Sequence, residues 1–204
     1  MPGAPRPIYF GNFRALPDSI DGVRLLKGVE ANILNTQGEL DVPERNLRRL
    51  EYVAVGLHAD CMQPGSVEEN TQAVLAALQN PWVNTLVHPG NPRFPIDCRR
   101  VVQAAVDCGV LIEINNSSLL GSRKGSEPTC SEIAKLAAAL RCPVVLGSDA
   151  HWSGDVGRLD VALALALSAG VPESAIINLH PHQIETLVLR NAERRQRAPR
   201  VTVR

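Results

Sequence analysis

The chain has 204 residues, which is the length of one domain with a sizeable hydrophobic core. Its 21 lysines and arginines balance 21 aspartates and glutamates, which argues against a general nucleic-acid binder and against a protein that binds anionic membranes. The sequence contains neither a transmembrane run of apolar residues nor a secretory signal, so we expect a cytoplasmic protein without a membrane partner.

The five cysteines are widely spaced and include no Cys-x-x-Cys pair. Tetrahedral thiolate sites usually bring their ligands in such close pairs, so a zinc site built on cysteine is not expected. No cysteine lies beside a histidine or in a recognisable nucleophile turn. We therefore expect reduced, mostly buried thiols.

Residues 1–20 are rich in proline and glycine and predict a loop, after which strand-like and helical patterns alternate. In chain order we expect a strand over residues 23–33, a helix over 43–51, a strand over 52–57, a helix over 67–79, a strand over 82–87, a helix from Asp97 to about Gly109, a strand over 110–114, a helix over 128–140, a strand over 144–147, and helices over 157–169 and 183–190. Ser66 and Glu69 have the spacing of a capping box. We predict a single domain over residues 1–190, followed by a basic, flexible tail over residues 191–204.

This alternation is typical of an α/β protein, either a parallel barrel or a doubly wound sheet, and the connectivity alone does not choose between them. Polar residues at the strand ends favour the barrel. Glu30 lies late in its predicted strand, and a polar side chain lies just past the end of each of four others: His58, His88, Asn115 and Asp149. Barrel enzymes collect their chemistry at the carboxyl ends of several strands in this way.

Two carboxylates and three imidazoles are expected to converge there: Glu30, His58, His88, Asp149 and His151. Taken singly, each has a structural explanation, since a histidine at a strand end is often a hydrogen-bonded core residue and Asp149 can cap the following segment. Together they predict a metal site. Histidine and carboxylate ligands without thiolate suit zinc, manganese or iron in hydrolytic centres. Such ions lower the pKa of a bound water to about 7, and Glu30 is the natural bridge between two of them.

The motifs around these residues resemble the polymerase and histidinol phosphatase (PHP) domain family, and within it the YcdX-type bacterial phosphatases. The matching segments are GVEAN at residues 28–32, GLH at 56–58, HPGNP at 88–92, EINNSS at 113–118, SRKGSE at 122–127 and GSDAH at 147–151. They occur in this order and are spread over residues 28–151. The resemblance implies a distorted (β/α)7 TIM-like barrel that holds up to three divalent metal ions and hydrolyses phosphoesters.

Carried over by motif, Glu30 resembles the carboxylate that bridges the first two metals, and His58 and His88 complete the second site. Asp149 resembles a ligand of the first site, so Glu30 and Asp149 are the expected catalytic carboxylates, while His151 resembles a ligand of the third. The resemblance further implies that substrate phosphate is received at the mouth of the site by a set of polar side chains: Asn115, Asn116, Arg123 and Lys124.

The chain departs from the family at its start. Members of this group begin with a strand carrying His-x-His, followed by a further histidine and an Asp-His-Gly, and none of these is present. We therefore expect a barrel that lacks its first strands, through a misplaced start codon or a fragment in which Met1 is internal. Only the second metal site keeps its full ligand set, and the open sheet edges favour self-association into a homo-oligomer.

We thus expect a metal-dependent phosphatase acting on a small phosphorylated substrate, with zinc as the first choice of metal and reduced activity in this form of the chain. One alternative is a catalytically inactive PHP-like remnant that serves as a binding or assembly module. Another is a metal-dependent hydrolase of C–N bonds, because amidohydrolase barrels also gather histidine and aspartate at strand ends. The basic tail lacks interleaved aromatics, so no nucleic-acid partner is expected.

Overall fold

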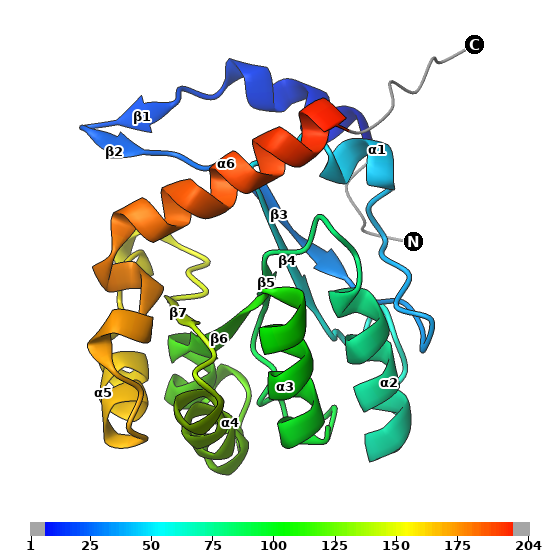
Figure 1. Cartoon of the computed structure of the whole chain (residues 1–204), viewed down its shortest axis with the longest axis vertical. Coiled ribbons are helices and arrows are strands. Elements are labelled where there is room, and N and C mark those ends of the chain that lie inside the picture. The colour runs from blue at the N-terminus through cyan, green and yellow to red at the C-terminus, as the bar shows by residue number, and fades with distance from the viewer. Residues whose placement is uncertain (1–6, 198–204) are drawn as a thin grey trace.

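A parallel sheet of five strands forms the centre of the molecule in a computed structural model that describes residues 7–197 (Figure 1). Its strands are β3 (Gly28–Asn32), β4 (Tyr52–Gly56), β5 (Thr85–Leu86), β6 (Leu111–Asn115) and β7 (Val144–Gly147). Each strand pairs with the next one along the chain, so the spatial order equals the sequence order. Doubly wound sheets reverse their strand order at a switch point, and this sheet does not. Within residues 7–197, however, β3 and β7 do not pair with each other, so the structure shows an α/β sheet and no closed barrel.

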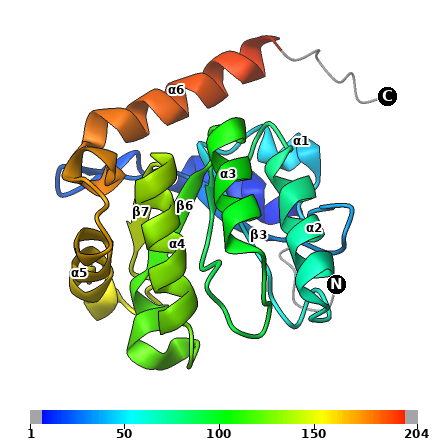
Figure 2. The same cartoon turned by 60° about the horizontal axis from the view of Figure 1, so that its bottom comes forward.

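Four helices cover one face of the sheet in the same order as the strands (Figures 1 and 2). They are α2 (Val67–Leu78), α3 (Cys98–Cys108), α4 (Glu127–Leu140) and α5 (Asp160–Ser168). The starts of α2 and α3 follow local sequence signals. Ser66 and Glu69 form the predicted capping box, and the Asp97 side chain accepts a hydrogen bond from the N–H of Arg100.

The two faces of the sheet differ in what they bury. Alternate strand residues on the helix side, such as Val53, Val55 and Ile112, belong to the hydrophobic core and are almost fully inaccessible. Residues of the opposite phase, such as Glu30 and Glu113, line a hollow of about 500 Å3. This period of two is what strand geometry dictates. The sheet therefore offers one apolar, covered face and one open face that carries carboxylates.

The amino-terminal segment is more structured than its sequence predicts. The expected loop contains the 3-10 helix η1 (Pro7–Ala15), and the expected strand over residues 23–33 is divided into two. Its first part, β2 (Val23–Arg24), pairs in a hairpin with β1 (Ser19–Ile20), and only the second part is β3. The turn between β1 and β2 is Asp21-Gly22, with φ values of 49° and 81°. Asp-Gly is a strong hairpin signal because both turn residues need positive φ.

The remaining elements differ from the prediction mainly in length. The first predicted helix is reduced to α1 (Glu44–Leu47), and the last is extended to α6 (Pro181–Arg197), which lies across the end of the sheet at which the strands begin (Figure 1). The expected tail boundary at residue 191 thus falls inside α6, while residues 198–204 lie outside the described part of the chain.

Short helical turns complete the structure: η2 (Ser118–Ser122), η3 (Ser153–Asp155), η4 (Glu173–Ala175) and η5 (Ile177–Leu179). Over residues 7–197, none of the helices has both the length and the apolar character needed to cross a membrane.

The outer edge of β7 is closed by a side chain. Asn178, in η5, accepts a hydrogen bond from the N–H of Leu146 at 2.7 Å and donates one to the Leu146 carbonyl at 2.9 Å. The carboxamide thereby satisfies the two backbone groups that another strand would otherwise satisfy.

Candidate metal centre

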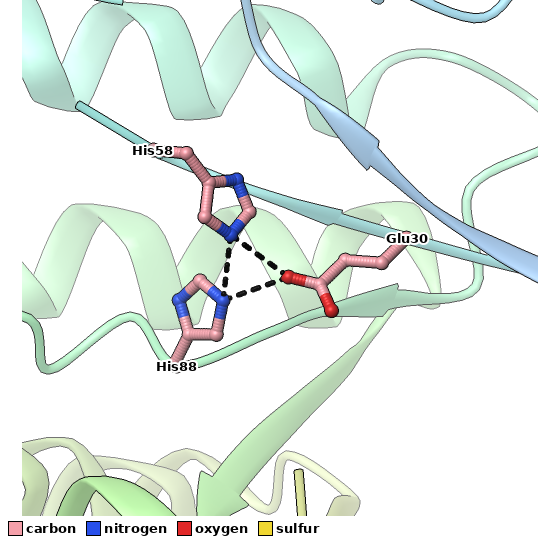
Figure 3. Close-up of side chains that lie close together, drawn as sticks. All are labelled: Glu30, His58 and His88. Carbon is pink, nitrogen blue, oxygen red and sulfur yellow. Dashed lines mark hydrogen bonds and ion pairs between the residues drawn. The ribbon is translucent and has the colours of Figure 1, made fainter. Parts of the chain in front are cut away.

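Glu30, His58 and His88 meet at the carboxyl-terminal side of three neighbouring strands (Figure 3). Glu30 lies within β3, and the two histidines follow β4 and β5. The Oε1 atom of Glu30 is 2.9 Å from the Nε2 atoms of both His58 and His88, and the two Nε2 atoms are 3.1 Å apart. Because parallel strands end at the same edge, residues far apart in the sequence supply one cluster.

Gly56 leaves room for the two imidazoles. A Cβ atom at Gly56 would lie 2.8 Å from Cε1 of His88 and 3.2 Å from Cε1 of His58, which is too close for any side chain. The glycine of the GLH motif is thus explained by packing against the rings, two residues before the first of them. Any larger residue would push the ligand atoms apart.

The protonation states expected in this cluster suit metal coordination. Burial opposes ionisation of Glu30, but hydrogen bonds from His58 and His88 outweigh it and hold the pKa of the carboxyl well below its usual range. Burial is also the main reason that the pKa of His88 is lowered, which favours the neutral ring. An ionised carboxylate and a neutral imidazole are the forms in which these groups bind metals.

The donor set supports a cation site on geometric grounds as well. One ligand atom from each of the three residues lies within 4.8 Å of the other two. In addition, Nδ1 of His58 is buried and has no hydrogen-bond partner, so the described contacts of that ring are made through Nε2, which faces the cluster. Three converging lone-pair donors of nitrogen and oxygen type can hold a divalent ion such as zinc, manganese or iron.

Asp149 and His151 lie outside this cluster. Asp149 has a φ of 51°, and its Oδ2 accepts a hydrogen bond at 2.8 Å from Nη1 of Arg123. His151 is 87% exposed in its side chain, with Nδ1 only 2.9 Å from the backbone oxygen of Asp149. The roles predicted for these two residues as metal ligands remain predictions.

The residues expected to contact substrate have different surroundings. Asn115 and Asn116 are buried, and their side-chain oxygens accept hydrogen bonds from the backbone N–H groups of Ser118 and Ala162. Arg123 is partly buried beside Asp149, whereas Lys124 is exposed. Substrate binding by these four side chains remains a prediction, and the two cations are the members with groups that suit an anion.

One residue of the site was missed by the sequence analysis. Glu113 lies in the middle of β6, and its Oε2 accepts hydrogen bonds from the backbone N–H of His88 at 2.7 Å and from Nδ2 of Asn115 at 3.2 Å. Burial raises the pKa of Glu113 to about 7. The available signal was a single charge inside the apolar segment LIEIN, on the face opposite the core.

Comparison with solved structures bears on the fold alone. A protein chain in a cryo-EM structure of archaeal ribonuclease P with mature tRNA superposes with a TM-score of 0.55 at 18% identity, covering 99% of this chain and 84% of that one. This similarity supports the α/β architecture described above. No family model matches the chain.

Comparison with curated proteins identifies close relatives. A probable phosphatase of Caldanaerobacter subterraneus subsp. tengcongensis is 48% identical over 179 residues, which are 87% of this chain and 70% of that protein. A probable phosphatase of Thermoanaerobacter sp. strain X514 has the same identity, and 73% of it is covered. One from Acetivibrio thermocellus is 43% identical over 97% of this chain and 81% of its own length. The chain therefore belongs to the family of these probable phosphatases.

Proposed function

We propose that the protein is a metal-dependent phosphatase of the PHP type that hydrolyses a small phosphomonoester. The observation that carries this proposal is the convergence of Glu30, His58 and His88, with ligand atoms about 3 Å apart. It occurs in a chain whose relatives are named probable phosphatases. The six motifs of the PHP resemblance, among them GVEAN, GLH and HPGNP, contain these same three residues.

The three residues would hold a divalent ion, with zinc, manganese or iron suited to the donor set. Such an ion supplies two kinds of chemistry when bound: it acidifies water to a pKa of about 7, and it stabilises negative charge on a phosphoryl group. The two imidazoles provide neutral nitrogen donors, and Glu30 provides the charge that offsets the cation. His88 is almost fully buried, at 3% exposure, so its ring direction is fixed by packing.

Further residues complete the proposed reaction site. Asp149 and His151 supply additional ligands in this proposal, as the motif GSDAH implies, and Arg123 releases Asp149 to do so. Arg123 and Lys124 then lie on one loop with their cationic groups available for substrate phosphate. The exposure of Lys124 supports its role toward substrate, whereas Arg123 would have to exchange Asp149, its partner at 2.8 Å, for the phosphate.

Elemental analysis combined with a phosphatase assay tests the proposal. We expect the purified protein to bind zinc or manganese and to hydrolyse p-nitrophenyl phosphate, but not a cyclic amide. In Glu30→Gln, which keeps the shape of the side chain but removes its charge, we expect metal affinity to fall at least about tenfold and hydrolysis to fall to background.

Glu173→Gln is the matched control, because Glu173 is an exposed glutamate in η4. It should leave metal content and rate unchanged. If Glu30→Gln retained the metal content and the rate of the unaltered protein, the proposed centre would be wrong. Hydrolysis of the cyclic amide in place of the phosphoester would favour an amidohydrolase instead.

A further inference from the structure

We infer that Glu113 is a positioning residue that holds the backbone of His88 in the conformation that aims its imidazole at Glu30 and His58. The consequence for metal binding rests on the proposed function, whereas the hold on the His88 backbone does not. Glu113 is not one of the clustered ligands, since its carboxylate is engaged with backbone and amide groups. It acts on the centre only through His88.

The backbone of His88 needs such a hold. Its φ is 34°, in the left-handed region that residues with a Cβ atom rarely adopt. His88 lies two residues after the end of β5, and this backbone conformation directs its Nε2 to 2.9 Å from Oε1 of Glu30. The N–H of His88 points to the neighbouring strand β6, where Oε2 of Glu113 accepts it at 2.7 Å. A short bond to a carboxyl oxygen is among the strongest that a backbone amide makes.

The position of the Glu113 carboxyl group depends on a hydrogen bond from Asn115 and on the space left by Gly147. Nδ2 of Asn115 donates to the same Oε2 atom at 3.2 Å, while Oδ1 of Asn115 accepts from the N–H of Ser118 at 2.7 Å. On the other side, a Cβ atom at Gly147 would lie only 1.8 Å from Oε1 of Glu113. The carboxyl group therefore occupies the volume that a side chain on β7 would otherwise fill. A glycine at position 147 is a requirement of this arrangement.

Two different substitutions thus disturb the same contact from opposite sides. Glu113→Ala removes the acceptor, and Gly147→Ala leaves the acceptor in the chain but displaces it from His88. Glu113→Gln keeps an oxygen that accepts the bond. Val145→Ala is the control, because Val145 lines the same hollow on β7 and makes no hydrogen bond to His88 through its side chain.

The first measurement uses metal-free protein, by NMR of the backbone amides. In Glu113→Ala and in Gly147→Ala, we expect the His88 amide proton to shift upfield and its hydrogen exchange to speed up at least about tenfold, because its acceptor is lost or moved. Glu113→Gln and Val145→Ala should leave the His88 signal protected. Circular dichroism establishes that each variant is folded.

The second measurement titrates Co2+ and records its visible absorption. Both disruptive variants should bind Co2+ about 10- to 100-fold more weakly with an altered spectrum, and Glu113→Gln should stay within about threefold of the unaltered protein. If the His88 amide remained equally protected in both disruptive variants, the inference would be overturned. It would also be overturned by unchanged Co2+ affinity and spectrum in them. Failure of the unaltered protein to bind Co2+ would refute the proposed metal centre, and the amide measurement alone would then decide on Glu113.

Discussion

The positions of individual side chains at the site depend on neighbouring glycines that leave space for them as much as on hydrogen bonds. Gly56 admits the rings of His58 and His88, and Gly147 admits the carboxyl group of Glu113. These glycines belong to strands far apart in the sheet, yet each stands where a functional side chain of another strand projects across the surface. The glycines in GLH and GSDAH are thereby given steric reasons that concern the site and not the backbone conformation.

The three clustered ligands could be predicted from the sequence because each follows or lies within a recognisable strand. The strand register then brings them together without further information. Glu113 could not be found in this way, since its nearest sequence partner, Asn115, gives no indication of the bond that it makes to another strand. Its role depends on the main chain of His88, which no side-chain pattern reveals. The ion pair between Asp149 and Arg123 also joins residues far apart in the sequence, so the sequence pattern did not predict it either.

Glu113 should make the stability of the metal-free protein depend on pH. Burial raises its pKa from 4.5 to about 7, so the folded state binds a proton there more tightly than the unfolded state does. The stability that this proton provides is complete below pH 4.5 and is lost as the pH rises through 7. Glu113→Gln removes the titration. Relative to the unaltered protein, the variant should therefore gain on the order of 3 kcal/mol in free energy of unfolding between pH 4 and pH 8.

Urea unfolding in EDTA at several pH values measures this difference. Comparing the two proteins at each pH cancels the contributions of other titrating groups. A constant difference across the whole range would mean that Glu113 titrates normally in the folded state.

At the level of the elements, capping residues predicted where helices begin, but the sequence did not predict how far each strand pairs with its neighbours. The starts of α2 and α3 were predicted because capping residues act on the nearest turn of helix. In contrast, the strand predicted over residues 82–87 is regular only at Thr85–Leu86, although Asn84 and Val87 also donate backbone hydrogen bonds to β4. The β1–β2 hairpin was missed although its Asp21-Gly22 turn was visible in the sequence.

The contribution of Asn178, whose carboxamide makes the two backbone hydrogen bonds that a further strand beside β7 would make, can be tested by substitution. Asn178→Ala would leave the N–H and the carbonyl of Leu146 without their described partner, so we expect a loss of about 1–3 kcal/mol in free energy of unfolding. Ser174→Ala, at an exposed position in η4, serves as the control and should change the value by less than about 0.5 kcal/mol. Equal stability of the two variants would show that water replaces the carboxamide at no cost.

For the molecule as a whole, metal binding and folding should be linked. The cluster draws its ligands from three strand ends and so does not exist in the unfolded chain. Mn2+ at a hundredfold excess over its dissociation constant should raise the free energy of unfolding by about 2.7 kcal/mol. For a protein of this size the corresponding rise in Tm is roughly 5–10 °C.

Mn2+ is preferred to zinc for this experiment because the five cysteines of the unfolded chain would bind zinc and reduce the effect. EDTA should reverse the shift, and Glu30→Gln should abolish it. A shift of equal size in Glu30→Gln would assign the stabilising ion to a different part of the protein.

The unbroken strand order described above also sets the sequence of events during synthesis. Glu30, His58 and His88 belong to the first three strands of the sheet, and Glu113 belongs to the fourth. If folding follows synthesis, we expect each strand-and-helix unit to find its docking surface already made, because its partner in space is its predecessor in the sequence. The three ligands would then come together before the bond that fixes His88 can form. A metal ion bound at that stage would meet an adjustable centre, which the addition of β6 would make rigid.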